Sequence, residues 1–131
     1  MASQLKVDTI TGVTTAGSIS VTGEGNSTTT NLQQGLAKAW VYAEADAVRT
    51  DSFNMSSSTD HGDGDFSYGL TAAFSAVTYS QSGMVRTGAR SKILTRNSDR
   101  STSSLIAVEV GNTSDAAQNY DHDVQAHGGL A

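Results

Sequence analysis

Apolar and polar residues alternate along most of the chain from Trp40 onward. In the clearest case, Ile106, Val108 and Val110 occupy every second position. Similar alternation occurs at residues 40–43, 53–56, 66–70, 77–80 and 120–127. A period of two places successive side chains on opposite faces of a β-strand, and turn-forming residues separate the stretches. The pattern predicts a mainly β chain with an antiparallel β-sandwich-like domain.

The segment Asp60–Gly64, DHGDG, separates two of these stretches. Glycine and aspartate readily occupy tight turns, so we predict a hairpin that joins a strand at Phe53 to a strand at Phe66. The aspartates at positions 60, 63 and 65 also suggest a calcium site. Their spacing differs from that of an EF-hand loop, and the glutamate at its last position is missing. The hairpin interpretation is therefore favoured.

The N-terminal segment carries only a thin apolar stripe. Leu5 and Val7 alternate with polar residues, as do Ile19 and Val21, and both pairs predict short extended strands. Two bulky groups on one face bury too little apolar surface to offset the entropy of ordering the segment. We therefore expect it to pack against the rest of the chain, another subunit or a host assembly. The expected oligomer interface consists of Leu5, Val7, Ile10, Ile19, Val21, Leu32 and Leu36.

The segment Thr29–Trp40, TTNLQQGLAKAW, predicts a helix of two to three turns. Thr30 and Gln33 have the spacing of a capping box. Apolar residues at positions 32, 36, 39 and 40 fall on one helical face, although Gly35 weakens the helix. We expect residues 1–39 to form an oligomerisation and anchoring segment, and residues 40–131 to form the β-sandwich-like domain.

Composition and charge exclude several classes of function. The chain has 131 residues, a formal net charge of -5 and no cysteine, which excludes thiolate zinc sites, iron–sulfur clusters and a cysteine nucleophile. The acidic balance disfavours nucleic-acid binding. No apolar run is long enough for membrane insertion, and the N-terminus lacks the pattern of a signal peptide. We expect a soluble chain that is not exported by a recognisable N-terminal route.

Two blocks of the sequence resemble a family of virion proteins of tailed bacteriophages, of the marine and cyanophage type. The first is LKVDTITGVTTAGSISVTGEGNSTTTNLQQGLAKAWV. The second, DSFNMSSSTDHGDGDFSYGLT, is similar to the family's Ser-Phe-Asn-Val-Ser-Ser and Asp-Asn-Gly-x-Gly-Asp-Tyr signature. The blocks follow one another in the family's order over about residues 2–70. Between them, YAEADAVRTD replaces the family's usual Asn-Gly-Thr-Gly segment, so this loop is expected to differ.

The resemblance implies a non-enzymatic virion structural protein that forms a fibre-like appendage, a tail fibre or tail-tip knob. It also implies a homotrimer that contacts other tail or capsid proteins and takes part in assembly and host attachment. The chain would be made in the host cytoplasm and reside on the virion. An alternative is a capsid decoration protein or head fibre. A less favoured alternative is a carbohydrate-binding or glycan-hydrolysing module, because the acidic residues are scattered over turns and strand ends.

Histidine and serine patterns do not indicate catalysis or a metal site. His122 and His127 are five residues apart and would face opposite sides of a straight strand. The Asp121–Asp123 segment, DHD, could belong to a Ser–His–Asp triad, but the chain lacks a Gly-x-Ser-x-Gly nucleophile motif. We therefore assign no catalytic residue, no metal and no cofactor.

A basic segment, RTGARSKILTRNSDR, spans residues 86–100. Arginine suits bidentate contacts with carboxylate or phosphate, so the segment could contact an anionic partner such as a host surface glycan or an acidic patch of a neighbouring virion protein. The favoured interpretation is a solvated loop or edge strand whose charges deter aggregation, or an intersubunit contact. The candidate contact residues are Arg86, Arg90, Lys92, Arg96 and Arg100.

The aromatic residues from Trp40 to Tyr79 follow the strand alternation. Such residues more often fill a core than form a platform for sugars, so we expect them inside the sandwich. They are Trp40, Tyr42, Phe53, Phe66, Tyr68, Phe74 and Tyr79.

Overall fold

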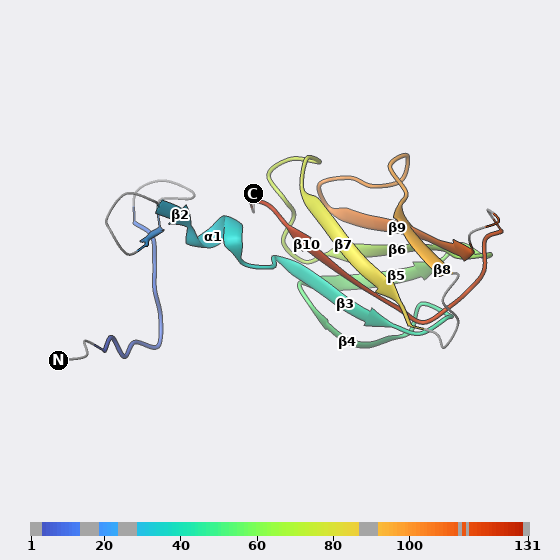
Figure 1. The fold of residues 1–131 in the computed structure, drawn as a ribbon, viewed down its shortest axis with the longest axis horizontal. Coiled ribbons are helices and arrows are strands. Elements are labelled where there is room, and N and C mark those ends of the chain that lie inside the picture. Colours follow the sequence, from blue (N-terminus) through green and yellow to red (C-terminus); the bar gives the residue numbers. More distant parts are fainter. Residues whose placement is uncertain are drawn as a thin grey trace.

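Two antiparallel sheets packed face to face form the body of the protein, and an N-terminal arm extends away from one end (Figure 1). The computed structural model describes residues 4–13, 19–23, 29–86, 92–112, 114 and 116–129. The predicted mainly β fold with an antiparallel sandwich-like domain is confirmed. Within the described ranges, no helix is long and apolar enough to cross a membrane.

Each sheet has four strands in an order that differs from the order along the chain. The first sheet runs β4 (Arg49–Phe53), β3 (Ala39–Ala43), β10 (His122–His127) and β7 (Ser80–Val85). The second runs β5 (Met55–Asp60), β6 (Asp65–Leu70), β9 (Leu105–Asn112) and β8 (Lys92–Arg96). Strands distant in sequence therefore meet at the centre of each sheet.

Apart from His122, the first sheet contributes only alanine and valine to the core, and the second sheet contributes the large aromatic and aliphatic side chains together with two valines. The first sheet contributes Ala39, Val41, Ala43, His122, Val124 and Ala126; the second contributes Phe66, Tyr68, Leu70, Ile106, Val108 and Val110. From the loop between β6 and β7, Phe74 and Tyr79 stack with ring centroids 4.4 Å apart. Complementary volumes of this kind let two inner faces interlock without voids.

Asn54 makes the sharp corner where the chain passes from one sheet to the other. It adopts a φ of 59° between the end of β4 and the start of β5. Its Nδ2 donates to the carbonyl oxygens of Lys38 (3.0 Å) and Ala72 (2.9 Å), and its Oδ1 accepts the Ala72 N–H (2.7 Å). Asparagine tolerates this left-handed conformation better than most residues. The corner is thereby tied to both neighbouring chain segments.

The predicted hairpin between β5 and β6 is present, with a turn of three successive positive-φ residues. These are Gly62, Asp63 and Gly64, at 93°, 43° and 77°. Asp60 Oδ1 accepts the Gly62 N–H at 2.8 Å. A Cβ on Gly64 would lie 2.1 Å from the Val110 carbonyl oxygen, so glycine is required both by conformation and by space. Asp60 thus serves as a turn-stabilising acceptor.

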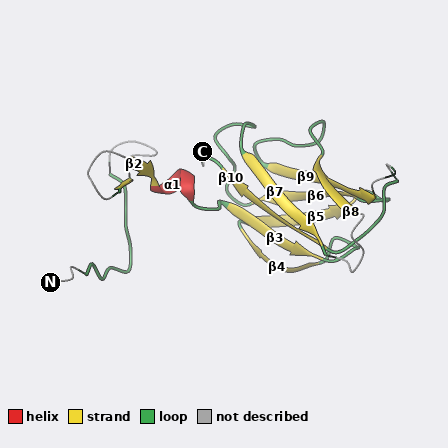
Figure 2. Cartoon of the chain, in the orientation of Figure 1, coloured by secondary structure: helices red, strands yellow, loops and turns green. Residues whose placement is uncertain are grey.

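The N-terminal arm contains little regular structure (Figure 2). Strands β1 (Ser20–Thr22) and β2 (Thr29–Asn31) pair with each other, and α1 (Leu32–Gly35) follows. Residues 4–13 form neither helix nor strand, so the predicted strand at Leu5 and Val7 is wrong. The predicted helix of two to three turns is also too long, since α1 ends at Gly35 and Ala39 already pairs with β10. Sheet pairing overrides the helical pattern there.

Several strand boundaries differ from the alternation pattern. Phe53 and Met55 belong to different strands, because the chain turns at Asn54. Val77 and Tyr79 precede β7 and belong to a loop. Strands β4 and β7 were not predicted at their observed positions, and β8 was expected only as a loop or edge strand within residues 86–100. All three lie at sheet edges, where partial exposure removes the need for a regular apolar face.

Replacing Asn54 tests the importance of the corner. In Asn54→Ala, three side-chain hydrogen bonds are lost at about 0.5–1 kcal/mol each, and alanine must adopt a positive φ at about 1–2 kcal/mol. We expect the free energy of unfolding to fall by about 3 kcal/mol in urea denaturation. Asn54→Gly keeps the backbone conformation and should lose about half as much. Equal stability of the two variants would contradict this account.

Candidate functional site

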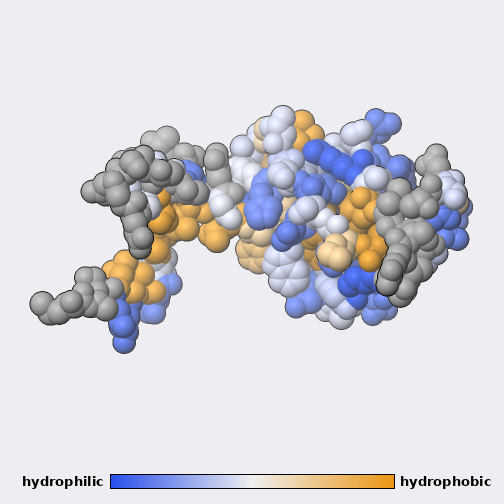
Figure 3. All heavy atoms as spheres, viewed as in Figure 1, coloured by the Kyte–Doolittle hydropathy of each residue, from blue (hydrophilic) through white to orange (hydrophobic). Residues whose placement is uncertain are grey.

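The apolar side chains of the N-terminal arm are open to solvent in the single chain. Leu5 is 81 % exposed and Val13 is 91 % exposed. Figure 3 shows hydrophobic residues on the surface of the arm, away from the sandwich. Of the residues predicted to form an oligomer interface, Leu5, Val7, Ile10, Val21 and Leu36 are exposed, and Ile19 and Leu32 are half-buried. The arm therefore presents apolar surface that this chain leaves uncovered.

The described arginines of the basic segment are engaged within their own chain. Arg86 donates to the Ala43 carbonyl oxygen (3.0 Å), and its guanidinium carbon lies 3.2 Å from the centre of the Tyr42 ring. Arg96 donates to the carbonyl oxygens of Val77 (2.9 Å) and Tyr79 (3.3 Å). Guanidinium groups used in this way hold loops in place, and their donors are less available to an external anion.

Arg100, the third described arginine of the basic segment, contacts a different part of the chain from the other two. Arg100 forms an ion pair with Asp65 at 2.9 Å. Arg90 lies outside the described residues, and so does the side chain of Lys92, whose backbone belongs to β8. The expectation that an edge strand carries part of this segment agrees with the position of β8.

Two carboxylates meet on the outer face of the second sheet. Asp65 on β6 lies directly opposite Glu109 on β9. Like charges in this arrangement repel, and two neighbours relieve the repulsion. Arg100 pairs with Asp65, and Asn97 Nδ2 donates to Glu109 Oε1 at 3.0 Å and to Asp65 Oδ1 at 3.4 Å. The sequence interpretation of scattered acidic residues is wrong at this point, because the fold brings these two together.

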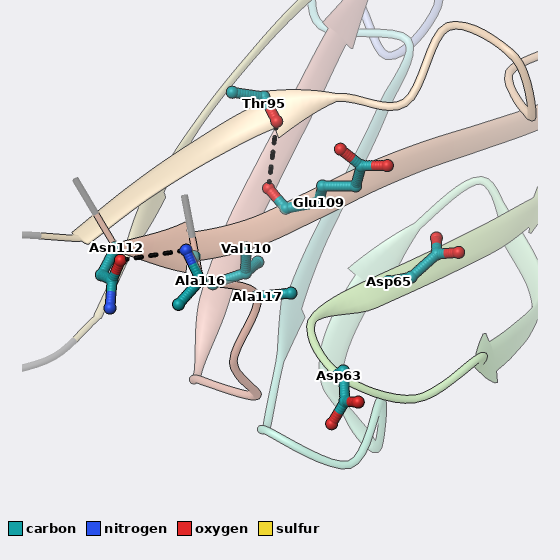
Figure 4. A pocket seen from close by; sticks show the side chains of 9 residues that line it. Asp63, Asp65, Thr95, Glu109, Val110, Asn112, Ala116 and Ala117 are labelled. Atoms are coloured by element: carbon teal, nitrogen blue, oxygen red, sulfur yellow. Dashed lines mark hydrogen bonds between the residues drawn. The ribbon is translucent and has the colours of Figure 1, made fainter. Parts of the chain in front are cut away.

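A hollow of about 140 Å³, lined by both polar and apolar residues, lies beside this pair (Figure 4). Asp63, Asp65 and Glu109 line it, together with Thr95, Asn112 and the apolar residues Val110, Ala116 and Ala117. Among the described residues, no group of three or more histidine, cysteine, aspartate or glutamate side chains is arranged to hold a metal ion. Because Arg100 and Asn97 already bind the paired carboxylates, the arrangement locks the β8–β9 loop onto the sheet.

His122 is fully buried and joins the two sheets. Its Nδ1 lies 2.8 Å from the Tyr120 carbonyl oxygen, so this nitrogen carries the proton and donates. Its Nε2 then accepts the Tyr68 hydroxyl at 2.6 Å. The Phe66 ring packs against the imidazole with centroids 4.6 Å apart. An enclosed, doubly bonded imidazole of this kind cannot approach a substrate, so the DHD segment has a structural role.

The electrostatic surroundings keep His122 neutral. Burial lowers the pKa of the imidazole, whereas the hydrogen bond to Tyr120 raises it. The positive charge of Arg86 also lowers this pKa, and the carboxylates of Asp123 and Asp121 oppose that effect. The same burial raises the pKa of its partner Tyr68, so the phenol keeps its proton and remains the donor.

A serine–histidine contact on the second sheet was not anticipated from the sequence. Ser67 Oγ and His61 Nε2 lie 2.8 Å apart. Ser67 is only 4 % exposed and sits within β6, not on a strained turn. The geometry of a nucleophile elbow is therefore missing at this pair, and the contact holds the His61 turn against the strand.

Buried neutral His122 makes stability depend on pH. The pKa of His122 is about 6.5 in the unfolded chain and lower in the folded chain. Below pH 6.5, His122 therefore binds a proton more readily in the unfolded state than in the folded state, which favours unfolding. We expect His122 to contribute a loss of stability of up to about 1.4 kcal/mol per pH unit below pH 6.5. Thermal unfolding between pH 8 and pH 5 measures this slope. His122→Gln should flatten it and His127→Gln should not; an unchanged slope in His122→Gln would refute the assignment.

Comparisons with protein-family models, curated proteins and solved structures found no match to this chain.

Proposed function

We propose that the chain is a non-enzymatic structural protein of a tailed-phage virion, in which it forms a fibre-like appendage at the tail. In this proposal the N-terminal arm assembles and anchors the subunit as a homotrimer. The β-sandwich faces outward and takes part in host attachment. The two sequence blocks that resemble phage virion proteins support this class of function.

The exposed apolar arm is the observation that carries the proposal. Leu5, Val7 and Ile10 lie on a segment without helix or strand, and each is more than half exposed. Burying one such side chain contributes about 1.5–3 kcal/mol. A chain segment that exposes this much apolar surface gains stability from a partner. A threefold arrangement supplies such a partner, because the thin apolar stripes of three chains can form one shared core, whereas the stripe of a single chain cannot.

The pairing of β1 with β2 supports the same conclusion. A two-stranded ribbon is marginally stable by itself in water, and Val21 in β1 is 53 % exposed. Leu36, just after α1, is exposed to the same extent. Contacts between sister arms would cover these residues and stabilise the ribbon.

A triple substitution in the arm tests the assembly role. In Leu5→Ser/Val7→Ser/Ile10→Ser the apolar stripe is lost, while the sandwich core is untouched. Light scattering coupled to size-exclusion chromatography should give about three times the 13.6 kDa chain mass for the unaltered protein and one chain mass for the variant. Lys6→Ser/Asp8→Ser/Thr9→Ser is the matched control and should remain trimeric. A monomeric unaltered protein, or a trimeric apolar-to-serine variant, would contradict the role of the arm.

Gold-labelled antibody on intact virions tests the location. We expect label at the tail in electron micrographs. Label over the shell would instead support the alternative of a capsid decoration protein or head fibre. Virions without label would overturn the virion function, provided the same antibody detects the purified chain.

A further inference from the structure

Three aromatic side chains lie side by side on the outer face of the first sheet. Trp40 on β3 is directly opposite Phe53 on β4, and Tyr42 is two residues further along β3. Phe53 is 54 % exposed and Tyr42 is 40 % exposed, whereas Trp40 is half-buried. The expectation that all strand aromatics belong to the core is therefore wrong for these three. Residues placed in this way lie about 5–7 Å apart.

Polar side chains flank the aromatic row in strict register. Gln125 on β10 lies opposite Trp40, and Asp123 lies opposite Tyr42. On the other side, Asp51 of β4 is also opposite Tyr42. This face is turned toward the viewer in Figure 1, and in the same view Figure 3 shows polar and hydrophobic residues intermixed over it.

Contacts within the sheet hold parts of this face in fixed positions. Arg86 stacks on the Tyr42 ring at 3.2 Å and is itself held by the Ala43 carbonyl oxygen. Gln125 Nε2 donates to Ser82 Oγ at 3.2 Å. A surface preorganised on two central strands loses little conformational entropy when a ligand binds.

We propose that this aromatic face, formed by Trp40, Tyr42 and Phe53 with Gln125, Asp51 and Asp123, binds an extended neutral polysaccharide. This inference rests on the proposed role in host attachment and names the ligand class and the site for it. It replaces the basic segment as the surface directed at a host glycan.

The chemistry of the face matches that of a sugar chain. A pyranose ring has a face of C–H groups and a rim of hydroxyl groups. The C–H groups are attracted to the negative face of an aromatic ring. At the edge of the row, carboxylates accept hydrogen bonds from sugar hydroxyls, and an amide group both accepts and donates them. The hollow beside Asp65 lies on the opposite outer face of the sandwich. A row of aromatic residues on a sheet face suits a chain that lies across the sheet better than a single enclosed sugar.

The charges on the face favour a neutral glycan and disfavour a second protein copy. Asp51 and Asp123 would repel uronate or sulfate groups. The positive charge of Arg86 is already held between the Tyr42 ring and the Ala43 carbonyl oxygen, so the face keeps a net negative charge. A closely packed protein interface would have to bury these carboxylates and the Gln125 amide away from water, which costs free energy unless each is paired. A hydrated polysaccharide satisfies such groups with its own hydroxyls and bridging water.

Trp40 is the single tryptophan of the chain, so its fluorescence reports on this face directly. The purified full chain is titrated with dextran, laminarin and galactomannan as neutral probes, and with alginate as an acidic probe. We expect at least one neutral polysaccharide to shift the emission of Trp40 and to retard the protein in affinity gel electrophoresis. Alginate should do neither. Retardation by alginate alone, or by none of the probes, would overturn the proposal.

Variants on the same sheet locate the binding surface. Phe53→Ala and Trp40→Ala should each weaken binding roughly tenfold or more in affinity electrophoresis, as expected for central aromatic contacts, whereas Trp40→Phe should retain most of it. Met84→Ala is the matched control, because Met84 is 69 % exposed at the far edge of the same outer face. Equal binding by all variants would place the glycan elsewhere and refute the site.

Two further measurements separate this inference from the function on which it rests. Circular dichroism shows whether each variant is folded, and light scattering shows whether it remains an oligomer. A loss of oligomerisation in Phe53→Ala would identify the aromatic face as a subunit contact and overturn glycan binding. Labelled virions combined with no polysaccharide binding would leave the structural function standing and reject only the aromatic-face proposal.

Discussion

One hydrogen bond across the core, from Tyr68 to His122, determines how the two sheets face each other. Both nitrogens of the buried imidazole are used, so neither sheet can slide without leaving a polar atom unpaired in an apolar interior. His122 faces the core, and the alternation of β10 places Val124 and Ala126 on the same side. Alternation then places Asp123 and Gln125 on the outer face. Which residues of β10 reach the outer face therefore depends on which residues of this strand pack in the core.

The two outer faces of the sandwich have become different surfaces. On the second sheet, the loop after β8 folds back, and its Ser101 hydroxyl accepts the Ala107 N–H at 3.3 Å, while Arg100 reaches Asp65. On that face the loop after β8 covers part of the sheet, and Arg100 neutralises one of the two paired carboxylates. On the first sheet, the aromatic face remains open. In the basic segment, Arg100 thus helps to hold the loop after β8 on one sheet, whereas Arg86 lies against Tyr42 on the other.

The sandwich and the arm are stabilised in different ways. The sandwich has a complete core of interlocking small and large side chains, so it needs no partner for its own packing. The arm has apolar residues but no core, and in our proposal it obtains one from sister subunits. A protein divided in this way can assemble through one end and bind through a face of the other part without either contact disturbing the other.

The sequence by itself determined the β class, the strands at β6, β9 and β10, the hairpin at Gly62–Gly64, and an arm too poor in apolar residues to fold alone. These features follow from local periodicity and turn chemistry. Only the tertiary structure decided which side of β3 is buried, because Val41 and its alanine neighbours alternate with Trp40 and Tyr42 and both sides are apolar enough to face a core. The small side was chosen because the opposite sheet supplies Phe66 and Tyr68, which leave no room for more rings. The pairing of Asp65 with Glu109 and the partners of the arginines likewise depend on strands far apart in sequence, which no local pattern records.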